Sequence, residues 1–159
     1  MGAVVKWSVI LAAIVAVLNV IWPIAGLHTS IVVGGILFIV LAIALNVWTL
    51  FMALKATASG NGYGAQLLNA LMFGLVAGVL VFAGSWVVLT YIFPDSIGES
   101  TAAMRDLLQG SGLPQDQIDA QVAALEASGP MHHARSGAIG TLVTSLISGA
   151  IIAIFKRRR

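Results

Sequence analysis

The stretch that decides the fold is residues 66–93, QLLNALMFGLVAGVLVFAGSWVVLTYIF, which contains no charged residue. A helix rises about 1.5 Å per residue, so this stretch is long enough to cross a hydrocarbon core of about 30 Å with some tilt. Gly74 and Gly78 lie four residues apart, a spacing that lets a second helix approach closely inside a membrane. Residues 66–93 therefore predict a membrane-spanning helix that packs through its glycines.

The composition of the whole chain agrees with a membrane protein. Of the 159 residues, 59% are apolar and 9% are charged, and the mean hydropathy is +1.00. A soluble domain has far more charge and less apolar content. We expect residues 1–159 to form a single membrane domain. The absence of cysteine excludes disulfides, thiol catalysis and thiolate zinc sites.

Three further apolar runs, at about residues 7–24, 31–54 and 136–155, complete an all-α, integral membrane four-helix bundle. Trp7 and Trp22 stand at the two ends of the first run, as is typical of residues at the two membrane interfaces. A cleaved signal peptide is the rival interpretation of this first run.

The segment 94–135 is the one polar segment of any size, and it holds all the acidic residues of the chain. Two short helices fit it: Thr101–Gln109, with Ser100 as a candidate N-cap, and Pro114–Ala127, with proline in its first turn. We expect a helical hairpin between spans 3 and 4, lying on the bundle or on the bilayer surface.

Charge predicts the orientation of the bundle. One side of the membrane carries the N-terminus, the 55–65 loop and the C-terminus, with six basic residues and no acidic one; the other side carries six acidic residues and two arginines. Basic loops stay in the cytoplasm. We therefore expect cytoplasmic termini and a hairpin that is periplasmic or external.

Several glycines are candidates for close helix packing, because small residues four apart allow helix backbones to meet in a membrane. The last span, with small residues spaced four apart, is expected to meet the Gly74 and Gly78 face of the third. The candidates are Gly34, Gly35, Gly74, Gly78, Gly140 and Gly149.

Each of the first three spans carries one asparagine: Asn19, Asn46 and Asn69. One interpretation is hydrogen bonding between helices. The other is a polar lining for a permeant solute. That lining would consist of Asn19, Asn46, Asn69, Ser85, Thr90 and Ser148.

The three histidines, His28, His132 and His133, all fall on the hairpin side. Imidazole together with carboxylate oxygen is a plausible ligand set for zinc, copper or iron, so these residues are candidates for an external metal site. The alternative is that they are solvated histidines at the membrane interface. His132 and His133 are adjacent and would point to different sides of a helix.

Catalytic and nucleic-acid-binding signatures are absent from the sequence. It contains no P-loop, dinucleotide fingerprint, HExxH or GxSxG pattern, and no span interior contains an ionisable residue. The basic cluster adjoins a span and has no interleaved aromatic residues. We therefore expect a non-enzymatic protein with no cofactor and no nucleic-acid partner.

The chain resembles a family of bacterial four-span membrane proteins known as a domain of unknown function, DUF4199. The resemblance lies in the NGYG motif at 61–64, the polar start of the third span at 66–69, the Pro94-Asp95 exit, the acidic insert, and the small-residue and basic end at 140–159. It covers essentially the whole chain. It implies four spans and a bacterial inner membrane, and it carries no established activity.

Three functional hypotheses follow. The first is a protein that acts by helix association, as an accessory, assembly or stabilising subunit of a larger membrane complex or as a homo-oligomer, with the lipid bilayer and a membrane protein as its partners. The second is a small channel or facilitator with an uncharged path. The third is an external metal-binding module on a membrane anchor.

Overall fold

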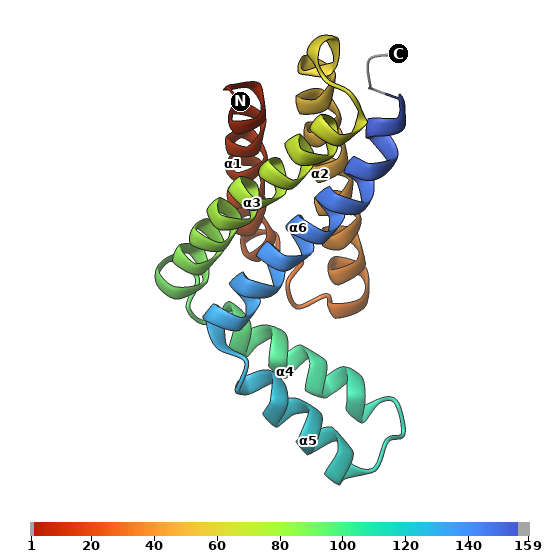
Figure 1. Cartoon of the computed structure of the whole chain (residues 1–159). Helices are drawn as coiled ribbons and strands as arrows, with labels where there is room; N and C mark the ends of the chain where they lie inside the picture. The colour runs from red at the N-terminus through yellow and green to blue at the C-terminus, as the bar shows by residue number, and fades with distance from the viewer. Residues whose placement is uncertain (1, 156–159) are drawn as a thin grey trace.

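The computed structural model describes residues 2–155, and the regular elements in this part of the chain are all helices (Figure 1). They are α1 (Gly2–Ile24), α2 (Ile31–Ala56), η1 (Ala58–Gly60), α3 (Tyr63–Val87), η2 (Val88–Ile92), α4 (Ser96–Gln109), α5 (Gln115–Glu126) and α6 (Gly129–Phe155). Helices α1, α2 and α6 and the continuous stretch α3–η2 are long and apolar enough to cross a membrane. The all-α, four-span prediction is confirmed.

Three of the long helices begin before the predicted spans. α1 begins at Gly2, α3 at Tyr63 and α6 at Gly129. Hydropathy marks the part of a helix that lies in hydrocarbon, whereas backbone hydrogen bonding continues through polar residues at the interface. The difference between the predicted and the observed start is largest for α6. Its first two turns contain His132, His133 and Arg135, so these residues belong to the last long helix and not to the insert at 94–135.

The third span ends in a single turn of π-helix, η2. The Phe93 N–H donates to the Val88 carbonyl at 2.8 Å, a bond that spans five residues. Pro94 follows, and a proline disfavours helical dihedrals in the residue before it. Such wide turns are frequent at functional sites.

Helices α3 and α6 lie side by side and run in opposite directions (Figure 1). An added Cβ on Gly74 would lie 3.0 Å from both Leu142 and Ser145, and one on Gly78 would lie 3.2 Å from the Ala138 carbonyl oxygen. A Cβ on Gly149 would collide with the Ala70 side chain. The structure thus places these three glycines where α3 and α6 meet.

The other three candidate glycines do not pack against a helix within the described chain. Gly34 faces the Leu27 carbonyl in the turn between α1 and α2, whereas an added Cβ on Gly35 or Gly140 would meet nothing within 4 Å. Helix α6 meets α3 through positions 138, 142, 145 and 149, spaced four, three and four residues apart. That spacing defines one face of a helix, and Gly140 lies outside it.

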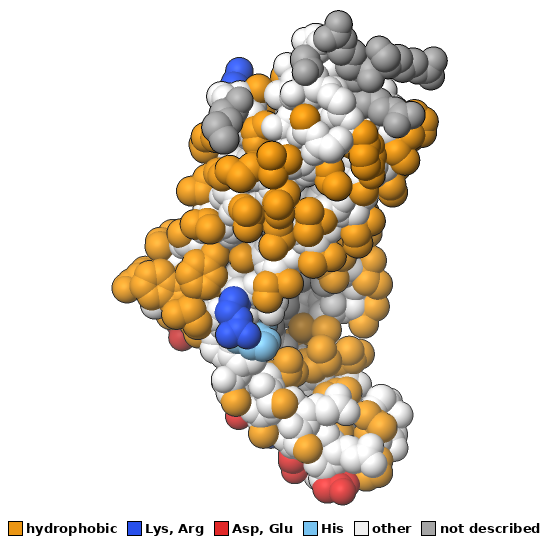
Figure 2. All heavy atoms as spheres, in the orientation of Figure 1, with side chains coloured by type: hydrophobic (Ala, Val, Ile, Leu, Met, Phe, Trp, Pro, Cys, Tyr) orange, Lys and Arg blue, Asp and Glu red, His pale blue; other side chains and the backbone are white. Residues whose placement is uncertain are grey.

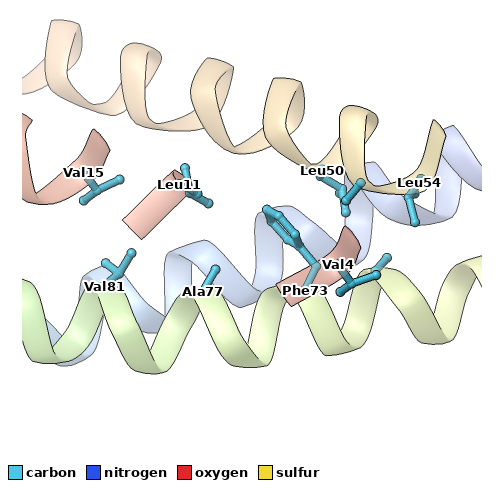
Figure 3. Close-up of a cluster of buried hydrophobic side chains, with 10 residues drawn as sticks. Val4, Leu11, Val15, Leu50, Leu54, Phe73, Ala77 and Val81 are labelled. Atoms are coloured by element: carbon cyan, nitrogen blue, oxygen red, sulfur yellow. The ribbon is translucent and has the colours of Figure 1, made fainter. Parts of the chain in front are cut away.

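The half of the bundle nearest the start of α1 has a solid core (Figure 3). Leu50, Leu54, Phe73 and Ala77 are all 0% exposed. In Figure 3 the Phe73 ring reaches from α3 into the space beneath α2, while Val4 and Leu11 close the core from α1. This half of the bundle is therefore closed.

Helices α4 and α5 form the expected hairpin, which extends beyond the end of the bundle opposite the start of α1 (Figure 1). Acidic side chains lie along it as far as its outer end (Figure 2). The predicted start at residue 101 is wrong, because α4 begins at Ser96. Ser100 is not an N-cap: its hydroxyl donates within α4 to the Ser96 carbonyl at 2.7 Å. Helix α5, Gln115–Glu126, directly follows Pro114.

Candidate functional site

A cavity of about 480 Å³ lies in the other half of the bundle, beneath the hairpin. Helices α1, α2, α3 and α6 and the π-turn η2 surround it, and α4 and Leu125 of α5 cover its end. No Asp, Glu, Lys or Arg is among the residues that line it. Its size falls in the range of small-molecule binding sites.

The cavity walls are largely apolar and include two aromatic side chains. Trp22 of α1 and Phe38 of α2 meet edge to face, with ring centroids 5.2 Å apart. Val15, Ile39 and Leu89 add aliphatic surface from three different elements. Aromatic and aliphatic walls of this kind bind hydrocarbon or flat apolar groups.

Two polar pairs border the cavity at depth. The Asn46 amide on α2 donates to the Thr141 carbonyl of α6 at 3.2 Å and accepts from the Ser145 hydroxyl at 3.2 Å. The Asn19 amide on α1 donates to the Ser85 hydroxyl of α3 at 2.9 Å. Both asparagines thus join helices, as the first interpretation expected, and both also line the cavity.

Asn69 lies elsewhere, at the opposite end of the bundle. Its amide donates to the Thr57 hydroxyl at 3.2 Å and to the Gln66 side-chain oxygen at 3.3 Å. Gln66 is fully buried and donates to the Leu54 carbonyl at 3.0 Å. This group fastens the turn between α2 and α3. Neither Asn69 nor Thr90 nor Ser148 lines the cavity, so the predicted set of six polar residues does not form one lining.

The hairpin is fastened to the bundle at His28. The His28 Nε2 lies 2.5 Å from the Glu99 carboxylate of α4, and the Ser100 hydroxyl donates to the His28 carbonyl at 3.1 Å. The His28 side chain is 13% exposed and its Nδ1 is buried with no hydrogen-bond partner in the described chain. His28 therefore links the α1–α2 turn to α4 at the hairpin end of the cavity.

The predicted metal site is not assembled within residues 2–155, where no group of three or more potential ligands forms. His28 pairs with Glu99. The rings of His132 and His133 lie at right angles, with centroids 6.2 Å apart. His28 and His133 both line the cavity, whereas His132 does not. The metal hypothesis stays a prediction. The solvated, interfacial interpretation fits His132 and His133, which are exposed, but not His28, which is mostly buried and paired with Glu99.

Glu99→Gln is expected to loosen the hairpin, because it removes the carboxylate that faces His28. Because Glu99 is 57% exposed, such a pair contributes about 0.2–1 kcal/mol, and amide hydrogen exchange in α4 should speed up by at most about fivefold. Asp106→Asn, an exposed change on the same helix, is the control and should leave exchange unchanged. Equal exchange in Glu99→Gln and the wild type would show that the pair does not hold the hairpin.

The fold and this cavity define a multi-pass membrane protein with four spanning helices and a binding-sized hollow at one end. The family model for a protein of unknown function, DUF4199, matches residues 6–158, and the chain belongs to that family. No match was found among the curated proteins or among the solved structures.

Proposed function

We propose that the chain is a non-enzymatic membrane protein that binds a small amphipathic molecule in the cavity beneath its hairpin. The observation that carries this proposal is the combination of aromatic and aliphatic walls with a few uncharged polar groups in one hollow of about 480 Å³. Small-molecule sites share this character: apolar walls give affinity and sparse polar groups fix orientation.

A continuous channel is less well supported than a binding site. The residues that line the cavity reach no further toward the start of α1 than Leu11 and Asn46. Beyond them lie Leu50, Leu54 and Phe73, all fully buried in a packed core. A solute that entered the cavity would therefore meet a closed floor.

Helix association, as an accessory or assembly subunit or as a homo-oligomer, is a second candidate function. It is favoured by Gly140, which faces open space on α6 and is one helical turn from the exposed Ser136. Small residues four apart on a bare helix face suit contact with another membrane helix, from a partner or a second copy.

For the location, we propose a bacterial inner membrane with both termini in the cytoplasm. Six of the eight basic residues are Lys6, Lys55 and the last four residues of the sequence, and the six acidic residues lie between Asp95 and Glu126. Since basic loops stay in the cytoplasm, the hairpin would face the periplasm or the exterior.

Ligand binding is tested with a brominated medium-chain alcohol, because bromine quenches the fluorescence of nearby indole rings. The protein for this test has Trp7, Trp48 and Trp86 changed to Phe. Trp22 then reports from the cavity wall. Gly35→Leu should weaken saturable quenching by at least about tenfold, because Gly35 lines the cavity and has room for a side chain.

Gly140→Leu is the matched control: it makes the same change where an added side chain also meets open space, away from the cavity. It should bind the alcohol as the parent protein does. Equal binding by both variants, or no saturable quenching in the parent, would contradict a ligand site in this cavity.

A further inference from the structure

The cavity wall is incomplete between α2 and α6. Ile39 of α2 lines the cavity and is nevertheless 57% exposed. Gly137 of α6 lines the cavity and is also exposed. Figure 2 shows a hollow where the apolar bundle meets the hairpin. On this side the cavity reaches the surface of the bundle.

The contacts that hold α2 to α6 explain the opening. Asn46 bonds to Thr141 and Ser145, and one helical turn further Leu50 lies near Gly149. These contacts lie at the floor of the cavity and in the closed core below it. From Asn46 toward the hairpin, both helices line the cavity, α2 through Ile39 and Ala42 and α6 through Gly137 and Thr141.

The surface of α2 beside this opening is apolar. Ile36, Val40 and Ile43, which neighbour Ile39 on α2, are all exposed. Helices α2 and α6 are both long and apolar enough to cross a membrane. Exposed apolar side chains on spanning helices face lipid, so the opening leads into the bilayer.

We propose that the cavity takes its ligand sideways from the bilayer, through the opening between α2 and α6, and that the ligand is a single-chain lipid with a small polar head. This proposal rests on the proposed function and adds the class of ligand and its route. A volume of about 480 Å³ suits one chain better than a two-chain phospholipid.

The distribution of polar groups sets the orientation of such a lipid. At the hairpin end, the Ser96 and Ser100 hydroxyls donate to backbone carbonyls, so their oxygens remain as acceptors for a polar head, and the His133 ring also belongs to the lining. Deeper in the cavity, the Asn19 and Asn46 amides already bond to neighbouring helices. The chain therefore lies along Trp22, Phe38 and Leu89, with its end toward the closed core.

The opening is tested by obstructing it and measuring the rate at which the brominated alcohol, supplied in lipid vesicles that contain the protein, quenches Trp22. Gly137→Phe places a ring at the opening, and an added Cβ there makes only ordinary contact, 3.8 Å from Val81. We expect binding to slow by at least about tenfold, because access then limits the rate.

Ile147→Phe, at an exposed position on the same helix that does not line the cavity, is the control and should bind at the parent rate. Ile39→Phe obstructs the opening from α2, at an exposed position, and should also slow binding. This second variant keeps the test decisive if Gly137→Phe disturbs folding. Parent-like rates in Ile39→Phe and in folded Gly137→Phe would overturn the lateral route while leaving cavity binding intact. No saturable quenching in the parent protein would overturn both proposals.

Discussion

Gly149→Leu is expected to lower the free energy of unfolding by about 3 kcal/mol, toward the upper end of the cost of overpacking. The new Cβ would collide with the Ala70 side chain, and it cannot rotate away because it is fixed to the backbone. Helices α3 and α6 form the most extensive contact in the bundle, so they would have to separate. Denaturant titration of the purified protein, followed by helical circular dichroism, measures the loss.

Gly140→Leu provides the comparison on the same helix. A side chain there meets open space, and removal of a glycine from a helix interior is itself stabilising by about 1 kcal/mol. The control should therefore be at least as stable as the wild type. If the two variants unfolded at the same denaturant concentration, that result would contradict the close contact between α3 and α6 at Gly149.

Phe73→Ala is expected to cost about 3–5 kcal/mol, the usual range for truncation of a fully buried aromatic residue. Phe73 is 0% exposed, and its ring fills the closed half of the bundle among Leu11, Leu50 and Leu54 (Figure 3). The loss combines missing contacts with the cavity that remains. Thermal unfolding in mild detergent is the measurement.

Phe155→Ala makes the same change at the end of α6, where the side chain is 78% exposed. Its effect should stay within about 0.5 kcal/mol. A loss for Phe73→Ala as small as that of Phe155→Ala would mean that the core near the start of α1 is loosely filled, and the closed floor of the cavity would then lose its support.

Much of the fold could be predicted from the sequence, because a membrane imposes one strong local rule: a spanning helix is a long apolar run. Residues 66–93 predicted the third membrane-spanning helix, and Gly74 and Gly78 within them predicted its contact with α6. The helix ends were less predictable, since α4 and α6 extend through polar residues such as Ser96 and His133 that hydropathy does not assign to a helix.

The candidate site was only partly predictable. Asn19 and Asn46 stood out as isolated amides in apolar runs, and both line the cavity. The hollow itself depends on how far α2 lies from α6 above Asn46, and no local pattern encodes that distance. The sequence predicted Trp22 only as a residue at the membrane interface, and nothing in the sequence set Phe38 apart. In the structure the two rings meet and form the aromatic part of the cavity wall.

Native mass spectrometry of protein extracted gently from its own membrane tests the central claim most directly. The account predicts that one lipid-like molecule remains bound per wild-type chain and per Gly140→Leu chain, and that it is absent from Gly35→Leu. Wild-type protein that carries no such molecule, or Gly35→Leu that retains it as fully as Gly140→Leu, would contradict the claim that the cavity beneath the hairpin is a binding site.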